Sequence, residues 1–169
     1  MKRLFITVLA ISCIQAASAQ LYGTILAGYG RSEFTSPAIE SGVLSSGTIA
    51  VSASRRSGWV EPSLQVAFHQ YGAEIKDVGI KARADYINTS CVLYFHLPAE
   101  DNHGVGVGIG PYAALNISNN GETLTGYSIA FFLRGPGVQL SGQLHRNVSE
   151  DKDKRFVYSS LMLGIPLRL

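Results

Sequence analysis

The chain has 169 residues, of which 46% are hydrophobic and only 15% are charged. This length fits one domain, and the charge content lies well below the roughly 25% that is usual for soluble domains. A formal net charge of +2 gives no support to a nucleic-acid-binding protein, and the scarcity of charge suggests an apolar environment.

The first twenty residues, MKRLFITVLAISCIQAASAQ, have the pattern of a secretory signal. Lys2 and Arg3 precede an apolar run, and an Ala-Ser-Ala motif precedes Gln20. We therefore predict a signal peptide over residues 1–19, cleaved between Ala19 and Gln20, and one mature domain over residues 20–169. Loss of Lys2 and Arg3 from the 14 basic residues leaves 12 against 12 acidic ones, so the mature formal charge is zero.

The two cysteines give little evidence of a covalent or metal site. Acylation of Cys13, as in a lipoprotein, is an alternative to cleavage after Ala19. Cys91 is the single cysteine of the predicted mature domain. No intramolecular disulfide and no cysteine-based metal cluster are therefore expected.

Alternation of apolar and polar residues recurs through the mature domain and predicts strands, each near the length that crosses a bilayer at a tilt. No apolar run of about 18 residues follows residue 20, so no transmembrane helix is expected. The eight predicted strands span residues 20–30, 47–54, 58–71, 83–97, 104–117, 126–135, 137–148 and 156–169.

Three of these strands sort cleanly into two faces. In the third, Val60, Pro62, Leu64, Val66 and Phe68 oppose Glu61, Ser63, Gln65 and His69. In the seventh, Val138, Leu140 and Leu144 oppose Gln139, Ser141, Gln143, His145 and Asn147. In the eighth, Leu161, Leu163, Ile165, Leu167 and Leu169 oppose Ser160, Met162, Gly164 and Arg168.

The segment GVGVGIGPYAAL, residues 104–115, places glycine at every second position. A phosphate-binding loop needs a G-x-G-x-x-G turn before a helix, and here Pro111 follows with no helical pattern. A period of two instead predicts a strand with one nearly bare face. In a narrow barrel, this face makes room for bulky interior neighbours such as Tyr94, Phe132 and Tyr158.

The predicted connections alternate in length along the chain. Residues 31–46, 72–82, 118–125 and 149–155 form long connections, whereas 55–57, 98–103 and 135–137 form shorter ones. This rhythm is typical of an up-and-down antiparallel barrel with tight turns at one end and loops at the other.

The residue types on the polar faces indicate which side of the barrel meets water. A strand surface facing solvent is normally rich in Lys and Glu, but these faces carry mainly Ser, Thr, Asn, Gln, Gly, Tyr and His. We therefore predict an eight-stranded transmembrane β-barrel with its apolar face on lipid, since a closed barrel is the sheet that a bilayer tolerates. A secreted, lipocalin-like barrel that binds a small apolar ligand is the soluble alternative.

The chain also resembles the outer membrane β-barrel family that includes PorT-like proteins of Bacteroidetes-type bacteria. The resemblance rests on EPSL at 61–64 leading into HQYGAEIK at 69–76, on the strand 86–95, and on GIGPY at 108–112. It covers roughly residues 20–169 and implies an eight-stranded outer membrane barrel. The sequence departs from the family pattern at Asn88-Thr89, where the family has Ile-Pro, and at Leu169, where it has an aromatic residue.

No catalytic, cofactor or metal site is predicted. None of the four histidines has a metal-ligand spacing to another or lies in a His-x-Ser motif. An acyl hydrolase or transferase acting on lipids would need a distant pairing, such as His69 or His145 with Ser141 or Ser63.

Three charged residues are predicted to meet inside the barrel near the mouth that holds both termini. Glu61 lies early in the third strand, and Arg134 and Arg168 lie late in the sixth and eighth. A carboxylate between two guanidiniums would form a polar network there. The alternative is that each charge is solvated at the rim.

These patterns predict a cell outer membrane protein with a structural, adhesive or interaction role through its extracellular loops, and without enzyme activity or cofactors. The expected partners are the lipid bilayer, the outer membrane assembly machinery and an unidentified loop partner. The protein is expected to be a monomer.

Overall fold

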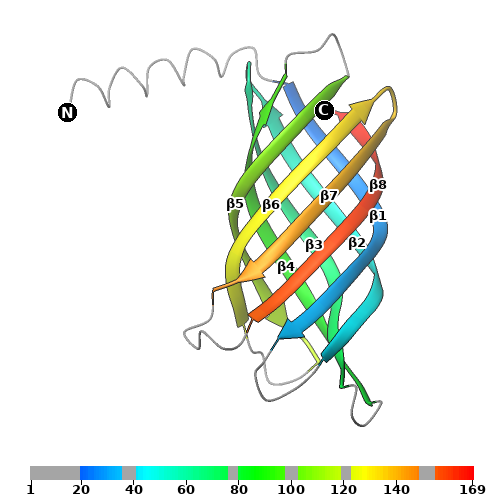
Figure 1. Ribbon diagram of the computed structural model, residues 1–169. Coiled ribbons are helices and arrows are strands. Elements are labelled where there is room, and N and C mark those ends of the chain that lie inside the picture. The colour runs from blue at the N-terminus through cyan, green and yellow to red at the C-terminus, as the bar shows by residue number, and fades with distance from the viewer. Residues whose placement is uncertain (1–19, 36–40, 76–79, 98–102, 119–122, 149–154) are drawn as a thin grey trace, which may run out of the picture.

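A computed structural model describes residues 20–35, 41–75, 80–97, 103–118, 123–148 and 155–169 (Figure 1). The predicted signal peptide, its Ala19 cleavage position and Cys13 lie outside these residues. The eight strands are β1 (Gln20–Thr35), β2 (Ser41–Arg56), β3 (Val60–Ile75), β4 (Ile80–His96), β5 (Gly104–Asn116), β6 (Thr123–Gly135), β7 (Val138–Asn147) and β8 (Arg155–Arg168). No helix in the described part of the chain is long and apolar enough to cross a membrane.

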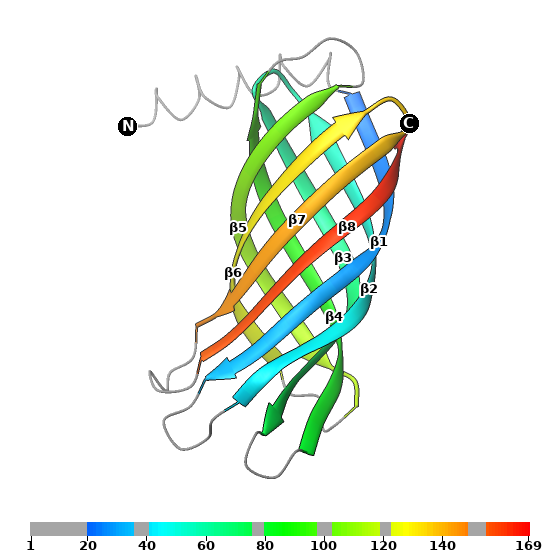
Figure 2. The ribbon, with the colours of Figure 1, turned by 45° about the vertical axis from the view of Figure 1, so that its right-hand side comes forward.

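Every strand pairs with its sequence neighbours, and β1 pairs with β8, so the sheet closes into an antiparallel barrel. Figures 1 and 2 show strongly tilted strands wound around one axis. The start of β1 and the end of β8 lie at one end, which we call the termini end. The opposite end, where β1 leads to β2 and β3 to β4, is the loop end. The predicted fold is confirmed.

The strands of the first half are longer at the loop end than predicted. β1 runs to Thr35 and β3 to Ile75, so the connections predicted at 31–46 and 72–82 shorten to 36–40 and 76–79. The polar residues in these segments suggested loops. Pairing nevertheless continues to Ser32↔Leu44 and Ile75↔Ile80, because a ladder needs backbone partners and not an apolar face.

Two turns at the termini end, β2–β3 and β6–β7, are tight. The turn predicted at 55–57 instead lies around Gly58, with Arg55 and Arg56 in β2 and an isolated bridge between Ser57 and Val60. Gly58 has a φ of 61° and Gly137, in the β6–β7 turn, has a φ of 72°. Glycine adopts this left-handed conformation without the steric cost that other residues incur.

The two faces of the barrel have opposite character. Exposed apolar side chains form an outer belt that includes Ile25, Ile49, Leu64, Phe95, Val107, Leu133, Leu163 and Ile165. The interior is filled by buried polar and aromatic side chains, with a small apolar cluster of Leu26, Ala50, Ala67 and Met162. The alternation predicted for the third, seventh and eighth strands has the predicted parity, although Arg168, predicted to face inward, is exposed.

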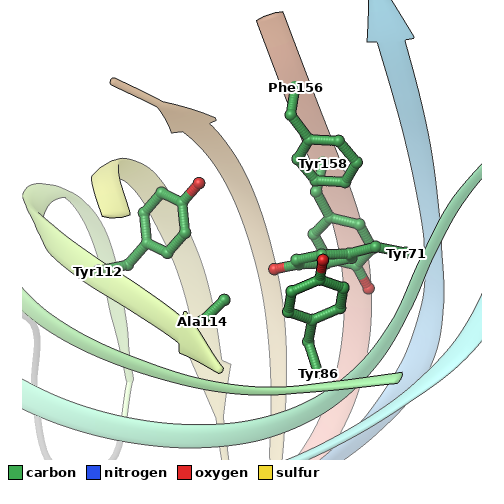
Figure 3. Packing of buried hydrophobic residues seen from close by; sticks show 6 residues of the cluster. All are labelled: Tyr71, Tyr86, Tyr112, Ala114, Phe156 and Tyr158. Atoms are coloured by element: carbon green, nitrogen blue, oxygen red, sulfur yellow. The ribbon is translucent and has the colours of Figure 1, made fainter. Parts of the chain in front are cut away.

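Aromatic rings fill the loop-end half of the lumen (Figure 3). The ring of Tyr71 lies 4.6 to 4.8 Å, between centroids, from the rings of Tyr86, Phe156 and Tyr158. These side chains come from the neighbouring strands β3 and β4 and from β8, which pairs with neither of them. They close the lumen as a packed core because an eight-stranded barrel is just wide enough to be filled by side chains.

The glycines of β5 make room for two of the three predicted aromatic residues. A Cβ on Gly106 would lie 2.5 Å from Cε1 of Phe132, and one on Gly108 would lie 2.8 Å from Cδ1 of Tyr94. The prediction was wrong for Tyr158, whose ring lies against Gly30 of β1. Alternation assigns a residue to a face, but the register around the barrel decides which residues meet.

Candidate functional site

A buried ion pair lies inside the termini end of the barrel. Nη2 and Nη1 of Arg134 donate to the two carboxylate oxygens of Glu61 over 2.7 and 3.1 Å. Nε of Arg134 donates to Gln139 over 2.9 Å, and the Ser54 hydroxyl donates to Glu61 over 2.5 Å. Bidentate, charge-assisted geometry of this kind is the strong form of an ion pair.

The guanidinium of Arg134 is also held by aromatic rings. Its carbon Cζ lies 4.4 Å from the ring centroid of Tyr22 and 4.6 Å from that of Phe132. These contacts add cation–π attraction to the ion pair. The charge of Arg134 is therefore matched by the Glu61 carboxylate and covered on two sides.

The third predicted member, Arg168, does not join this pair. Its side chain is exposed, and it lines a recess at the termini end together with Tyr22, Arg134, Gly135, Gly137 and Pro166. Arg168 has the inward parity, but it pairs with Tyr22 at the last rung of β8, where the barrel opens. The structure therefore joins two of the three predicted residues, and the third corresponds to the solvated-rim alternative.

A second polar cluster lies deeper in the lumen and was not predicted. Gln65 and Gln143 exchange two side-chain hydrogen bonds, of 3.1 and 2.7 Å. Nδ1 of His145 lies 2.6 Å from the Ser128 hydroxyl, and Nδ1 of His69 lies 2.6 Å from the Thr48 hydroxyl. Gln65 and Gln143 are 78 positions apart, so no local pattern could have paired them.

His69 and His145 lie side by side, with ring centroids 5.8 Å apart. The other ring nitrogen of His145 contacts the amide oxygen of Gln143 at 3.2 Å. No group of three His, Cys, Asp or Glu side chains suited to a metal ion occurs among the described residues.

The serine partner of His145 is Ser128, and neither Ser141 nor Ser63, the partners considered from the sequence, fills this place. Ser141 instead accepts a hydrogen bond from Gln139 over 2.9 Å. In the Ser128–His145–Gln143 chain a neutral amide occupies the position that a carboxylate holds in a catalytic triad. The pair is fully buried among Tyr112 and Tyr158, so it has the geometry of a structural hydrogen bond.

The outer belt has the chemistry of a lipid-facing surface. Leu163 and Ile165 are each 61% exposed, and the belt is nearly free of charge between the two ends of the barrel. Trp59 is exposed in the β2–β3 turn and Tyr29 toward the loop end, which places an aromatic residue near each border of the belt, as membrane barrels do. An exterior this apolar requires a bilayer.

Three strands project at the loop end. The ladder β2–β3–β4 continues to Ser41↔Ile75 and Ile75↔Ile80, whereas β4 and β5 pair no further than Tyr86↔Asn116. In Figure 2 the hairpin of β3 and β4 extends past its neighbours. Its exposed residues include Lys81 and Arg83, so charge appears where the apolar belt ends.

Comparison with solved structures places this fold among small outer membrane barrels. OprG of Pseudomonas aeruginosa superposes with a TM-score of 0.56 at 10% identity, over 88% of this chain and 96% of OprG. Ail of Yersinia pestis, in complex with the heparin analogue sucrose octasulfate, superposes with a TM-score of 0.51 at 13% identity, over 88% of this chain and 99% of Ail. Neisserial surface protein A superposes with a TM-score of 0.51 at 15% identity, over 87% of this chain and 97% of that protein.

No family model and no curated protein matches this sequence. The chain has the fold of an eight-stranded outer membrane β-barrel. This fold and the apolar exterior both support an outer membrane location, in which the barrel is embedded in lipid.

Proposed function

We propose that this protein is an interaction protein of the outer membrane, which presents the loop end of a rigid barrel to partners outside the cell. The observation that carries this proposal is the combination of a packed lumen with a three-stranded sheet projecting beyond the apolar belt. In bacterial barrels the tight turns are periplasmic and the longer connections extracellular. The termini end is accordingly periplasmic, and the loop end faces outward.

The packed lumen argues against a channel. Aromatic rings fill its loop-end half, and the Glu61–Arg134 pair lies across the lumen below the recess at the termini end. We propose that the protein has no catalytic activity, because the Ser128–His145 pair is enclosed and has no carboxylate partner among the described residues. The outer belt argues against the soluble, lipocalin-like alternative, in which those apolar side chains would face water.

The finer family assignment is also a proposal. The PorT-like resemblance rests on short motifs, and in the structure these lie in β3, β4 and β5. We propose that the chain is delivered by a cleaved signal, inserted by the outer membrane assembly machinery and active as a monomer. Its physiological partner at the loop end would decide between adhesion and another interaction role.

Cysteine labelling of whole cells tests the presentation of the loop end. In a Cys91→Ser background, Lys81→Cys should react with a membrane-impermeant maleimide on intact cells. Arg168→Cys should react only after the outer membrane is permeabilised. The reverse pattern, or stepwise conductance by the purified barrel in planar bilayers, would contradict the proposed function.

A further inference from the structure

At the loop end, no described strand pairs with the side of β4 that faces β5. Its pairing with β3 runs without interruption from Val60↔Phe95 to Ile75↔Ile80. On the other side, the last rung with β5 is Tyr86↔Asn116. Residues 80–84 therefore have β3 on one side and, within the described residues, no strand on the other.

The backbone groups of this edge point outward in a definite pattern. The carbonyl of Asp85 accepts from the N–H of Ile117 over 2.9 Å, and the N–H of Asp85 donates to the Ser118 hydroxyl over 2.8 Å. In an antiparallel sheet every second residue turns its N–H and C=O to the same side. Lys81 and Arg83 therefore continue the row that Asp85 begins, and no described strand takes up their backbone groups.

The side chains along this edge define the strand that fits it. Lys81 and Arg83 are exposed on the outer face of the barrel, and Ala82 and Ala84, which alternate with them, have the inward parity. A strand laid against β4 would set its own residues directly opposite these four. Opposite charges in such cross-strand positions stabilise a sheet and like charges destabilise it. The fitting strand alternates acidic residues on one face with small or apolar residues on the other.

A second copy of this chain fits the edge poorly. Two copies pairing edge to edge about a two-fold axis through Ala82 would place Lys81 opposite Arg83 at both rungs. Basic side chains on an open edge are a common protection against such self-pairing. The same charges that disfavour a second copy favour an acidic partner.

We propose that the edge of β4 at Lys81–Arg83 binds an extended acidic segment of another protein, which adds a strand to the projecting sheet. This inference rests on the proposed function, because it names the partner of the loop end. Main-chain hydrogen bonds to Lys81 and Arg83 hold the segment, and alternate acidic side chains select it.

The test uses the full mature barrel in lipid nanodiscs at low salt. The probe is a blocked, fluorescently labelled nine-residue peptide alternating Glu with Val, and its counterpart alternates Lys with Val. Binding is followed by fluorescence anisotropy, and exchange of backbone amides is followed at Lys81 and Arg83. Arg83→Ala removes the charge alone, whereas Arg83→Pro also removes the outward N–H without removing a bond to β3.

The Glu peptide should bind and protect the amides of Lys81 and Arg83, and the Lys peptide should bind roughly tenfold more weakly. The double variant Lys81→Glu/Arg83→Glu should reverse this preference. Arg83→Pro should bind more weakly than Arg83→Ala, with heat-modifiable migration of both variants showing intact barrels.

The inference would be overturned if the Glu peptide did not bind or if both peptides bound with equal affinity. It would also be overturned if Arg83→Pro and Arg83→Ala bound the Glu peptide equally, or if dimers protected these amides without peptide. Nanodisc binding does not depend on orientation in the cell. If Lys81→Cys labels on intact cells while the peptide fails to bind, the inference falls and the proposed function stands.

Discussion

The Glu61–Arg134 pair puts two charges in the termini end of the lumen with almost no access to water. Glu61 is 1% exposed and Arg134 is 6% exposed. Such a pair is costly to desolvate, and removal of one partner is costly as well, because the remaining charge stays buried without compensation. The sequence placed both residues on the inward face, but only the closed barrel brings β3 to β6 across the lumen.

Replacement of Glu61 by alanine should lower the free energy of unfolding by about 3 kcal/mol, because the Arg134 guanidinium loses its carboxylate. Urea titration of the folded barrel in detergent measures this loss. Arg168→Ala is the control and should change stability by less than about 0.5 kcal/mol, since this side chain lies exposed at the rim. Equal effects of the two variants would show that the pair contributes no more than a surface charge.

Gly106 should not tolerate a side chain. The new Cβ of Gly106→Ala would lie 2.5 Å from the Phe132 ring, so the variant should lose about 1 to 3 kcal/mol through overpacking. Gly47→Ala is the matched control, because a Cβ at Gly47 has no neighbour within 4 Å. Phe132→Leu should partly restore Gly106→Ala in the same unfolding assay. If Gly106→Ala and Gly47→Ala were equally stable, the β5 glycines would not be needed to make room for the aromatic rings.

At the scale of elements, strand parity was predictable from the sequence and strand length was not. Alternation correctly predicted that Leu64 faces outward and Gln65 inward. This parity is strongly specified, because a shift of the strand register by one residue would expose the whole polar face to lipid. Beyond the belt, residues 72–74 of β3 are all half-buried and residues 81–83 of β4 are all exposed, so the alternation is lost there while the ladder continues. The bulge in β2 between Val43 and Thr48 also had no sequence signature.

The lipid-facing role of β8 predicts that the effect of an added charge depends on depth. Leu163→Arg should destabilise the folded barrel by about 2 to 4 kcal/mol, and Leu167→Arg, on the same face near the termini end, by about 0 to 1 kcal/mol. Unfolding in lipid vesicles measures both values. If the two variants were equally stable, β8 would not cross the bilayer in the proposed way.

At the scale of the whole molecule, the barrel combines a sealed interior with an asymmetric exterior. Its termini end has tight β2–β3 and β6–β7 turns, whereas at the loop end residues 80–84 of β4 pair with β3 alone among the described strands. Strand number, closure and the lipid-facing side followed from periodicity and residue type. The Gln65–Gln143 and Ser128–His145 contacts did not, since contacts across a lumen depend on the register of all eight strands.

The most direct test of this account is the orientation of β8 relative to lipid. Single cysteines in a Cys91→Ser background at Leu161 and Leu163, and at Ser160 and Met162, are labelled with a fluorophore and reconstituted with brominated lipid. The account predicts strong quenching at 161 and 163 and little at 160 and 162, because the second pair lies in the packed lumen. Equal quenching at all four positions, or the opposite alternation, would contradict an apolar face on lipid.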